Sequence, residues 1–280
     1  MSEMKEKKSR KPFFYRVIYT ILKAFTPKYA LDGVENLPKD KPCVFVGNHC
    51  QMYGPLAAVF YMKNTQLWCI GDLMDNKNVA KYAYQDFWSM KPKAFRWFYK
   101  ILAHVFGRLL VYVFTNAPTI PVYYDQRTLT TFRKTVAALE QGKNVIIYPE
   151  CRTYKNNVIN EYRSNFIDLA RLYGRRGGDP LTFVPVYVAP KKGKVVFGSS
   201  IEYDKNNAPD VERERVCQFL MEQTTNLALS MPRHKVVPYV NAPTRKYMYN
   251  TPLVELSEET APFFRKKKQK RLEKQDSEKQ

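Results

Sequence analysis

Runs of apolar residues alternate with amphipathic segments along most of the chain. The runs at 145–148 and 182–188 are continuously apolar, which is typical of strands covered on both faces of a sheet. By the same criterion, further strands are expected at 42–46, 66–70, 119–123 and 194–197. Helical spacing predicts helices near 55–63, 77–84, 128–141, 164–175 and 209–230. This alternation predicts an α/β fold with a mainly parallel central sheet wrapped by helices.

Two other helical segments expose more apolar surface than a core helix does. Segment 14–25 has apolar residues at helical spacing, with Arg16 and Lys23 elsewhere on the helix. Segment 93–114 is apolar and aromatic apart from a basic stripe along one side, made of Arg96, Lys100, His104 and Arg108. Each helix either packs on the core or lies in the plane of a membrane interface, and Trp97 favours the interface for the second.

The longest uncharged stretch, residues 42–62, is long enough to cross a bilayer. Asn48, His49 and Gln51 lie near its middle, where unpaired polar groups are costly in lipid. We therefore interpret it as a buried strand, a loop and the start of a helix, and we expect no transmembrane helix.

The 280 residues are enough for one sizeable core. We expect a single domain over 13–264, preceded by a basic arm at 1–12 and followed by a charged tail at 265–280. The two ends serve either as solubilising segments or as attachments to anionic lipid.

The charge balance points to anionic partners. Lys and Arg number 46 against 26 Asp and Glu, which gives a formal net charge of +20. The 20 Tyr, 17 Phe and 3 Trp beside these cations favour an anionic membrane surface over nucleic acid, because amphipathic rings settle at headgroup depth. Patterns of nucleic-acid modules such as RRM aromatics, KH loops or zinc-finger spacing are not found in the sequence, which disfavours a nucleic-acid binder.

The cysteines and the N-terminus bear on location. Five cysteines include no Cys-x-x-Cys pair, and the N-terminus lacks the order of a signal peptide. With the charge, these features predict a cytoplasmic protein that is peripheral on the inner face of the cell membrane.

Two groups of polar residues follow predicted strands. Asn48 and His49 come after the strand at 42–46, at the kind of position where α/β sheets bind ligands, and an imidazole can take a proton near neutral pH. Glu150, Arg152 and Thr153 follow the strand at 145–148. The carboxylate could orient an imidazole and the arginine suits a phosphate, whereas a structural histidine and a surface salt bridge are the simpler alternatives.

Two further blocks complete an ordered set. Ile120-Pro121-Val122 is followed by Asp125 and Arg127, and Val184-Pro185-Val186 comes last. Over about residues 30–200, the four blocks together resemble the 1-acylglycerol-3-phosphate or lysophospholipid acyltransferase superfamily. In that family the blocks read Asn-His-x4-Asp, Ile-Pro-Val followed by Arg, Phe-Pro-Glu-Gly-Thr-Arg-Ser, and Val-Pro-Val.

The resemblance implies a glycerolipid-acyltransferase-like fold and acyl transfer. His49 would remove a proton from the hydroxyl of a lysophospholipid or glycerol-phosphate-type acceptor, and the oxygen would attack the thioester of acyl-CoA or acyl-carrier protein. The acyl donor is a co-substrate, so no further cofactor and no metal is expected. Asn48, Arg127, Arg152 and Thr153 are the predicted substrate-binding residues.

The blocks also depart from the family pattern. Gly54 stands where the family has the aspartate that holds the imidazole, and by analogy with catalytic triads such a loss costs about 10⁴ in rate. Cys151 replaces a glycine, and arginine comes one place early as Arg152. We expect Glu150 to orient His49 instead, with Asp72 and Asp125 as weaker choices. The alternative is a non-catalytic, lipid- or acyl-binding member of the same fold.

Overall fold

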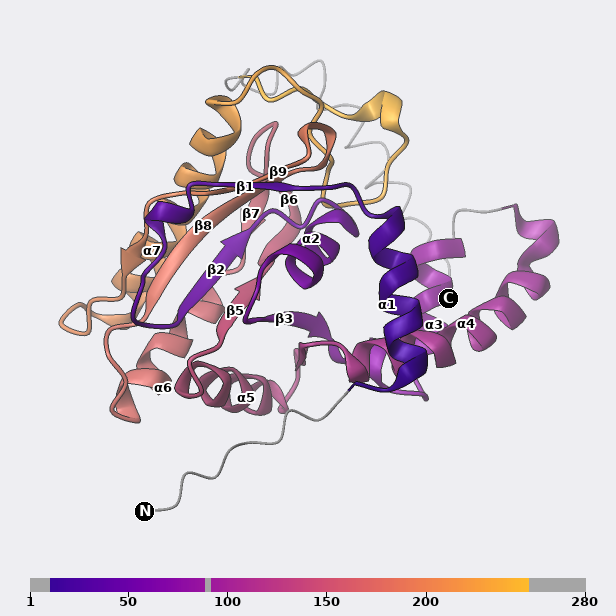
Figure 1. Ribbon diagram of the computed structural model, residues 1–280, viewed down its shortest axis with the longest axis horizontal. Coiled ribbons are helices and arrows are strands. Elements are labelled where there is room, and N and C mark those ends of the chain that lie inside the picture. Colours follow the sequence, from indigo (N-terminus) through magenta and orange to yellow (C-terminus); the bar gives the residue numbers. More distant parts are fainter. Residues whose placement is uncertain (1–10, 89–91, 252–280) are drawn as a thin grey trace, which may run out of the picture.

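The computed structural model describes residues 11–88 and 92–251 of the 280. Within this part of the chain, eight strands form one sheet in the order β1-β9-β8-β2-β5-β3-β4, with β10 beside β8 (Figure 1). Their bounds are β1 Ala30–Asp32, β2 Cys43–Gly47, β3 Thr65–Ile70, β4 Thr119–Val122, β5 Asn144–Ile147, β8 Thr182–Ala189, β9 Lys194–Phe197 and β10 Ile201–Glu202. A separate hairpin pairs β6 (Glu150–Tyr154) with β7 (Asn160–Tyr162).

Five of these strands run in one direction. β2 is parallel to both β8 and β5, β5 is parallel to β3, and β3 is parallel to β4. The carboxyl ends of β8, β2, β5, β3 and β4 therefore meet at one edge of the sheet. All residues of β2 and β8 are buried, in agreement with the continuous apolar runs that predicted them.

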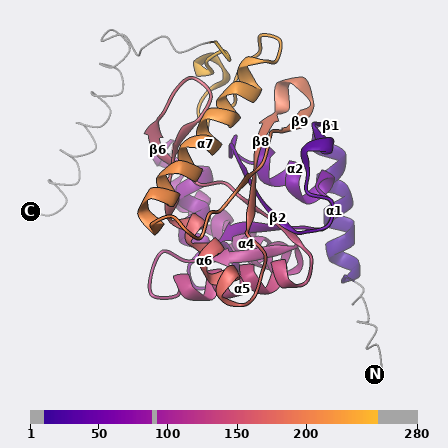
Figure 2. The ribbon, with the colours of Figure 1, turned by 90° about the vertical axis from the view of Figure 1, so that its left-hand side faces the viewer.

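Helices cover both faces of the sheet. Their bounds are α1 Phe13–Phe25, α2 Tyr53–Tyr61, α3 Val79–Ala83, α4 Arg96–Asn116, α5 Thr128–Glu140, α6 Leu169–Arg175 and α7 Pro209–Leu229. One apolar cluster joins α5, α6 and α7 to the sheet, and a second joins α2 to the opposite face. Figure 2 shows α7 and α2 on opposite sides of β8. The predicted α/β fold with a mainly parallel sheet wrapped by helices is thus confirmed.

Alternation along single strands divides the two clusters. In β2, Val44 and Val46 face the α5–α7 side, whereas Cys43 and Phe45 face the α2 side. Because both sets are apolar, this strand is stable only between two covering layers, which places the end of β2 at the centre of the molecule.

The two amphipathic helices lie outside these layers. The buried residues of α4 are Ala103 and Gly107, and Tyr15 is the buried residue of α1. The stretch 42–62 forms β2, a turn and α2, as expected. By length and composition alone, α4 is a candidate membrane span. From the sequence we expected no transmembrane helix and did not consider this segment as one. Apart from residues 11 and 12, the predicted basic arm and the charged tail lie outside the described residues.

Candidate active site

Three of the four motif blocks meet at the carboxyl edge of the sheet. β2 lies between β8 and β5, so the residues after Gly47 and Ile147 are neighbours and Val184-Pro185-Val186 runs beside them. The block on β4 is separated from β2 by β5 and β3, which is roughly 14 Å at the usual strand spacing.

Asn48 extends the β2–β8 pairing with its side chain. Its Oδ1 accepts the Val188 N–H at 2.7 Å, and its Nδ2 donates to the Val188 carbonyl at 3.1 Å. The residue is only 2% exposed. Both polar groups of this predicted substrate-binding residue are therefore engaged inside the fold, where they fix the backbone that leads to His49.

The Glu150 carboxylate binds two backbone amides. One oxygen accepts the N–H of His49 at 2.5 Å, and the other accepts the N–H of Asn160 at 2.9 Å. We expected this carboxylate to orient the imidazole of His49, but the bond that forms goes to the backbone of the same residue. Glu150 thus positions His49 by its main chain, and its buried side chain ties β2 to the β6–β7 hairpin.

The imidazole of His49 lies among aromatic rings. The ring centroid is 5.4 Å from that of Tyr148 and 5.5 Å from that of Tyr239, and both contacts are edge-on. Its Nδ1 is buried without a hydrogen-bond partner. Burial lowers the pKa of His49 to about 4, against the carbonyls of Gln51 and of His49 itself, which favour the protonated ring. The ring is therefore neutral at pH 7.

The turn after His49 leaves no space at Gly54. A Cβ there would lie 2.6 Å from the His49 carbonyl oxygen and 3.0 Å from that of Asn48. Cys50 and Gln51 adopt φ values of 37° and 58°, which bend the chain back so that the Gly54 N–H donates to the His49 carbonyl at 3.3 Å. The missing aspartate is thus accompanied by a backbone path that excludes any side chain at this position.

Burial acts on Glu150 in the opposite direction. It raises the pKa of this carboxyl to about 7, although the two amide hydrogen bonds favour the ionised form.

Cys50, 1% exposed, packs with Ala57 and Ala58 of α2, and burial raises the pKa of its thiol well above the usual value. Cys50 therefore contributes to packing and is not a nucleophile at neutral pH.

Two arginines act electrostatically on Tyr239, whose ring contacts that of His49. Arg152 and Arg163 both influence the ionisation of Tyr239, whose pKa is raised first of all by burial, and both are exposed. The Arg163 guanidinium lies over the ring of Tyr124 at 5.1 Å. Thr153 is exposed on β6 next to Arg152. Sequence reasoning missed Arg163, because it falls in none of the four blocks.

Arg127 is held elsewhere. Its Nη2 and Nε bind Asp125 at 2.7 and 3.0 Å, and its guanidinium lies 4.1 Å from the ring centre of Tyr123. Among the described residues, the contacts of this predicted substrate-binding residue are with Asp125 and Tyr123, and none is with His49. Asp125 is occupied by the same pair, so it does not orient the imidazole, and Asp72 acts electrostatically on Arg127.

A strap formed by residues 231–251 closes one side of the site. Tyr239 contacts the His49 ring, and the Tyr247 hydroxyl accepts a hydrogen bond from Gln51 at 3.2 Å. The strap is anchored by His234, whose Nε2 lies 2.8 Å from the Tyr187 hydroxyl on β8. No motif marked these residues in the sequence, because they lie far along the chain from His49.

Metal binding finds no support in the described ranges, where no group of three or more His, Cys, Asp or Glu side chains is placed to hold an ion. The arrangement instead offers a neutral imidazole that is fixed through its backbone and contacts Tyr239, a residue on which two arginines act electrostatically.

Comparisons with known proteins identify the family of this chain. No curated protein sequence gives a significant match. Among solved structures, the 1-acyl-sn-glycerophosphate (LPA) acyltransferase PlsC from Thermotoga maritima is similar at 14% identity and a TM-score of 0.45, with 78% of each chain covered. The family model described as Acyltransferase matches residues 28–189, which is more than half of the chain. This chain therefore belongs to the acyltransferase family.

Proposed function

We propose that this protein transfers an acyl group from acyl-CoA or acyl-carrier protein to a lysophospholipid or glycerol-phosphate-type acceptor at a membrane surface. The observation that carries the proposal is the position of His49. Its neutral imidazole stands at the end of a central strand, with its backbone held by Glu150, and it contacts the ring of Tyr239, on which Arg152 and Arg163 act electrostatically. A neutral imidazole can accept a proton, and the two cations suit the phosphate of the acceptor.

The reaction needs one proton shuttle. His49 takes the proton of the acceptor hydroxyl while the oxygen attacks the thioester carbonyl, and the tetrahedral intermediate then expels the thiolate. The imidazolium returns its proton to that sulfur, so the products are an ester and a free thiol. Burial and the missing aspartate both disfavour the imidazolium, so the proposed turnover is slow.

All the predicted site residues except Arg127 have a part in this proposal. Asn48 and Glu150 position His49 through its backbone. Arg152 and Thr153, together with Arg163, receive the acceptor headgroup. Arg127 stabilises the turn before α5 through Asp125 and lies outside the reacting group.

The proposed location is the inner face of the cell membrane, with the protein peripheral to it. The net charge of +20 favours an anionic surface, and α1 and α4 expose large apolar side chains.

A second candidate is a non-catalytic protein that binds lipid or acyl chains. The observation in its favour is the environment of the His49 ring, whose Nδ1 has no partner and whose usual aspartate is excluded by the backbone at Gly54. In this case Arg152 and Arg163 would hold a headgroup without reaction.

Radiolabelled acyl-CoA with a panel of lyso-lipids separates the two candidates. We expect slow ester formation by the wild type, loss in His49→Ala, and no change in Lys134→Ala, which alters an exposed residue of α5. Turnover that survives His49→Ala would remove the proposed mechanism. Saturable lyso-lipid binding without turnover would establish the second candidate.

A further inference from the structure

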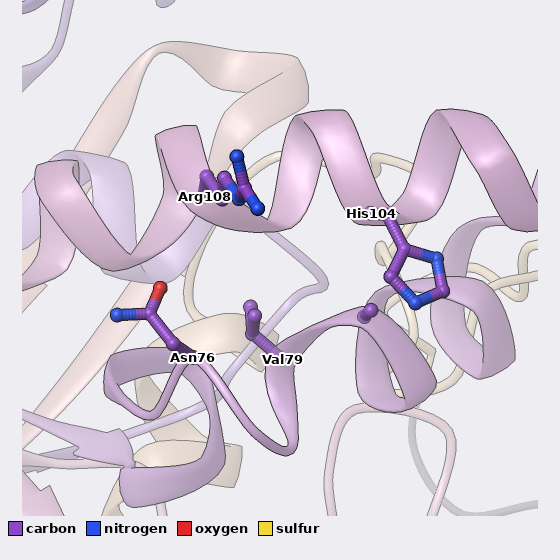
Figure 3. Close-up of a pocket in the computed structure, with 5 residues that line it drawn as sticks. Asn76, Val79, His104 and Arg108 are labelled. Carbon is purple, nitrogen blue, oxygen red and sulfur yellow. The ribbon is translucent and has the colours of Figure 1, made fainter.

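A pocket of about 460 Å³ lies between α4 and the segment that leads into α3. It is lined by Asn76, Val79, Ala80, His104 and Arg108. Figure 3 shows Asn76 and Val79 opposite the side of α4 that carries His104 and Arg108. These residues belong to none of the four motif blocks, so the pocket is separate from the His49 site.

Small residues create this pocket. A Cβ at Gly107 would meet Cγ1 of Val79 at 3.0 Å, and both Gly107 and Ala103 are buried where α4 crosses α3. His104 and Arg108 each follow one of these small residues by one position. Their longer side chains therefore stand at the rim of the close contact, where they border the pocket.

The polar groups of the pocket suit a phosphate. Arg108 is exposed, and no ion pair joins it to any residue whose side chain the structure describes. His104 lies with Nδ1 2.8 Å from the Lys100 carbonyl, so Nδ1–H donates to that oxygen and Nε2 remains for a ligand. Among the described residues that line the pocket, none carries a carboxylate. A guanidinium beside amide and imidazole groups is a common environment for phosphate oxygens.

Apolar side chains adjoin these cations. Ile101 and Val105 follow Lys100 and His104 by one position, which is about 100° around the helix, and they are 57% and 67% exposed. Trp97, at 65%, stands one turn earlier. A cationic stripe between a buried side and an exposed apolar side is the arrangement of a helix at a bilayer interface.

α1 extends the apolar surface. Phe14 packs against Tyr112 of α4 with ring centroids 5.7 Å apart, and the Lys11 ammonium donates to the Asn116 carbonyl at 2.7 Å. The exposed Phe13 and Phe25 belong to this helix. Figure 1 places α1 and α4 on the same side of the molecule, opposite α7.

We propose that the α3–α4 pocket binds the phosphate of an anionic bilayer lipid, and that exposed apolar side chains of α1 and α4 insert beside it. This docking site deepens the membrane partner of the proposed function and requires no turnover. We choose an anionic lipid as the ligand because of charge complementarity. The chain has a net charge of +20, and the pocket is cationic with apolar side chains at its rim.

Flotation of the full chain with vesicles tests the site. The vesicles contain phosphatidylcholine alone or with phosphatidylglycerol. The variants are Arg108→Gln and, as a control, Arg133→Gln, which removes the same charge from an exposed position on α5. We expect binding to the phosphatidylglycerol vesicles, an about fivefold loss in Arg108→Gln, and nearly none in Arg133→Gln. Equal losses of vesicle binding in the two variants would mean that overall charge alone causes the binding. That result would overturn the proposal that the pocket binds a lipid phosphate.

The apolar rim has its own readout. The fluorescence of Trp97 should be quenched by brominated lipids, and Trp97→Phe should remove that signal while circular dichroism stays unchanged. Val105→Ser should weaken binding to both kinds of vesicle. Release of the wild type by free inorganic phosphate would identify a site for a soluble ligand, and resistance to high-salt extraction would identify α4 as a membrane span; either result overturns the proposal.

Flotation and turnover report on separate claims. An inactive protein that docks through Arg108 refutes only the catalytic proposal, whereas an active one that ignores anionic lipid refutes only the docking site.

Discussion

The Glu150 carboxylate accepts the backbone N–H of His49 at 2.5 Å, and its second oxygen accepts that of Asn160. One buried side chain therefore joins the end of β2 to the β6–β7 hairpin. Since both of its oxygens are used by main-chain donors, the position of the imidazole depends on this carboxylate although the ring does not touch it.

Glu150→Gln should destabilise the fold. The amide NH₂ of glutamine faces one of the two backbone donors, which leaves a buried N–H without an acceptor and costs about 1–3 kcal/mol. Urea unfolding measures the loss. Glu161→Gln, on the same hairpin, alters a partly exposed pair with Lys155 and should change the free energy of unfolding far less. Equal effects of the two changes would contradict the role given to Glu150.

His49→Gln should reveal a pH dependence. The pKa of Glu150 is raised from 4.5 to about 7, so the folded state binds its proton more tightly, and the free energy of unfolding falls as pH rises from about 4.5 to 7. The pKa of His49 is lowered from 6.5 to about 4, so its contribution to the free energy of unfolding rises with pH from about 4 to 6.5. This rise offsets the fall that Glu150 causes. In urea unfolding, the free energy of unfolding of the wild type should change little between pH 4.5 and 6.5. That of His49→Gln should fall as the pH rises over the same range. A free energy of unfolding that does not change with pH in either protein would rule out the raised pKa of Glu150.

Gly54→Ala should be destabilising although it adds one methyl group. The new Cβ would overlap the His49 carbonyl oxygen at 2.6 Å, and relief by backbone movement costs about 1–3 kcal/mol. Gly174→Ala in α6 is the matched control, because nothing lies within 4 Å of its Cβ position. Thermal unfolding should show a lower Tm for the first and an unchanged or higher Tm for the second. A Gly54→Asp variant that gains activity without loss of stability would show that the turn is not fixed.

Tyr239→Ala should raise the pKa of His49 toward 6.5. The ring of Tyr239 covers the imidazole edge-on at 5.5 Å, and its removal admits water that stabilises the charged form. Tyr239→Phe keeps the ring and should leave the value near 4. Titration of the imidazole C–H resonance by NMR separates the outcomes, and identical titrations would exclude the strap as the cause of burial.

Arg163→Gln should weaken acceptor binding. A guanidinium that meets a phosphate contributes about 1.5–3 kcal/mol, so KM for a phosphate-bearing acceptor should rise about tenfold or more while kcat changes little. Arg127→Gln should leave KM unchanged, because Arg127 is tied to Asp125 at the end of β4. The reverse ranking would move the acceptor site from β6–β7 to β4.

The buried strands were predictable because their chemistry is local. Continuous apolar runs located β2, β5 and β8 within one residue at each end, and their common direction brought His49 and Glu150 to one edge. The β6–β7 hairpin escaped prediction, because its residues are polar and its stability comes from contacts such as the one between Glu150 and Asn160.

The fine geometry of the site could not be predicted. The sequence shows that residue 150 has a carboxylate but not what that carboxylate binds. Its partner is the backbone N–H of His49, and because every residue except proline has such a group, no sequence pattern marks it. Tyr239 and Arg163 reach the site through folding of distant segments. Conversely, Gly54 was visible in the sequence as a departure from the family pattern, but only the close approach of the His49 carbonyl in the fold explains it.

The strap has a consequence for synthesis on the ribosome. His49 leaves the ribosome long before Tyr239 and Tyr247, which follow it far along the chain. Until then the imidazole remains in contact with water and is an ordinary base. The low pKa of His49 is therefore acquired only when the strap of residues 231–251 closes over a histidine made long before.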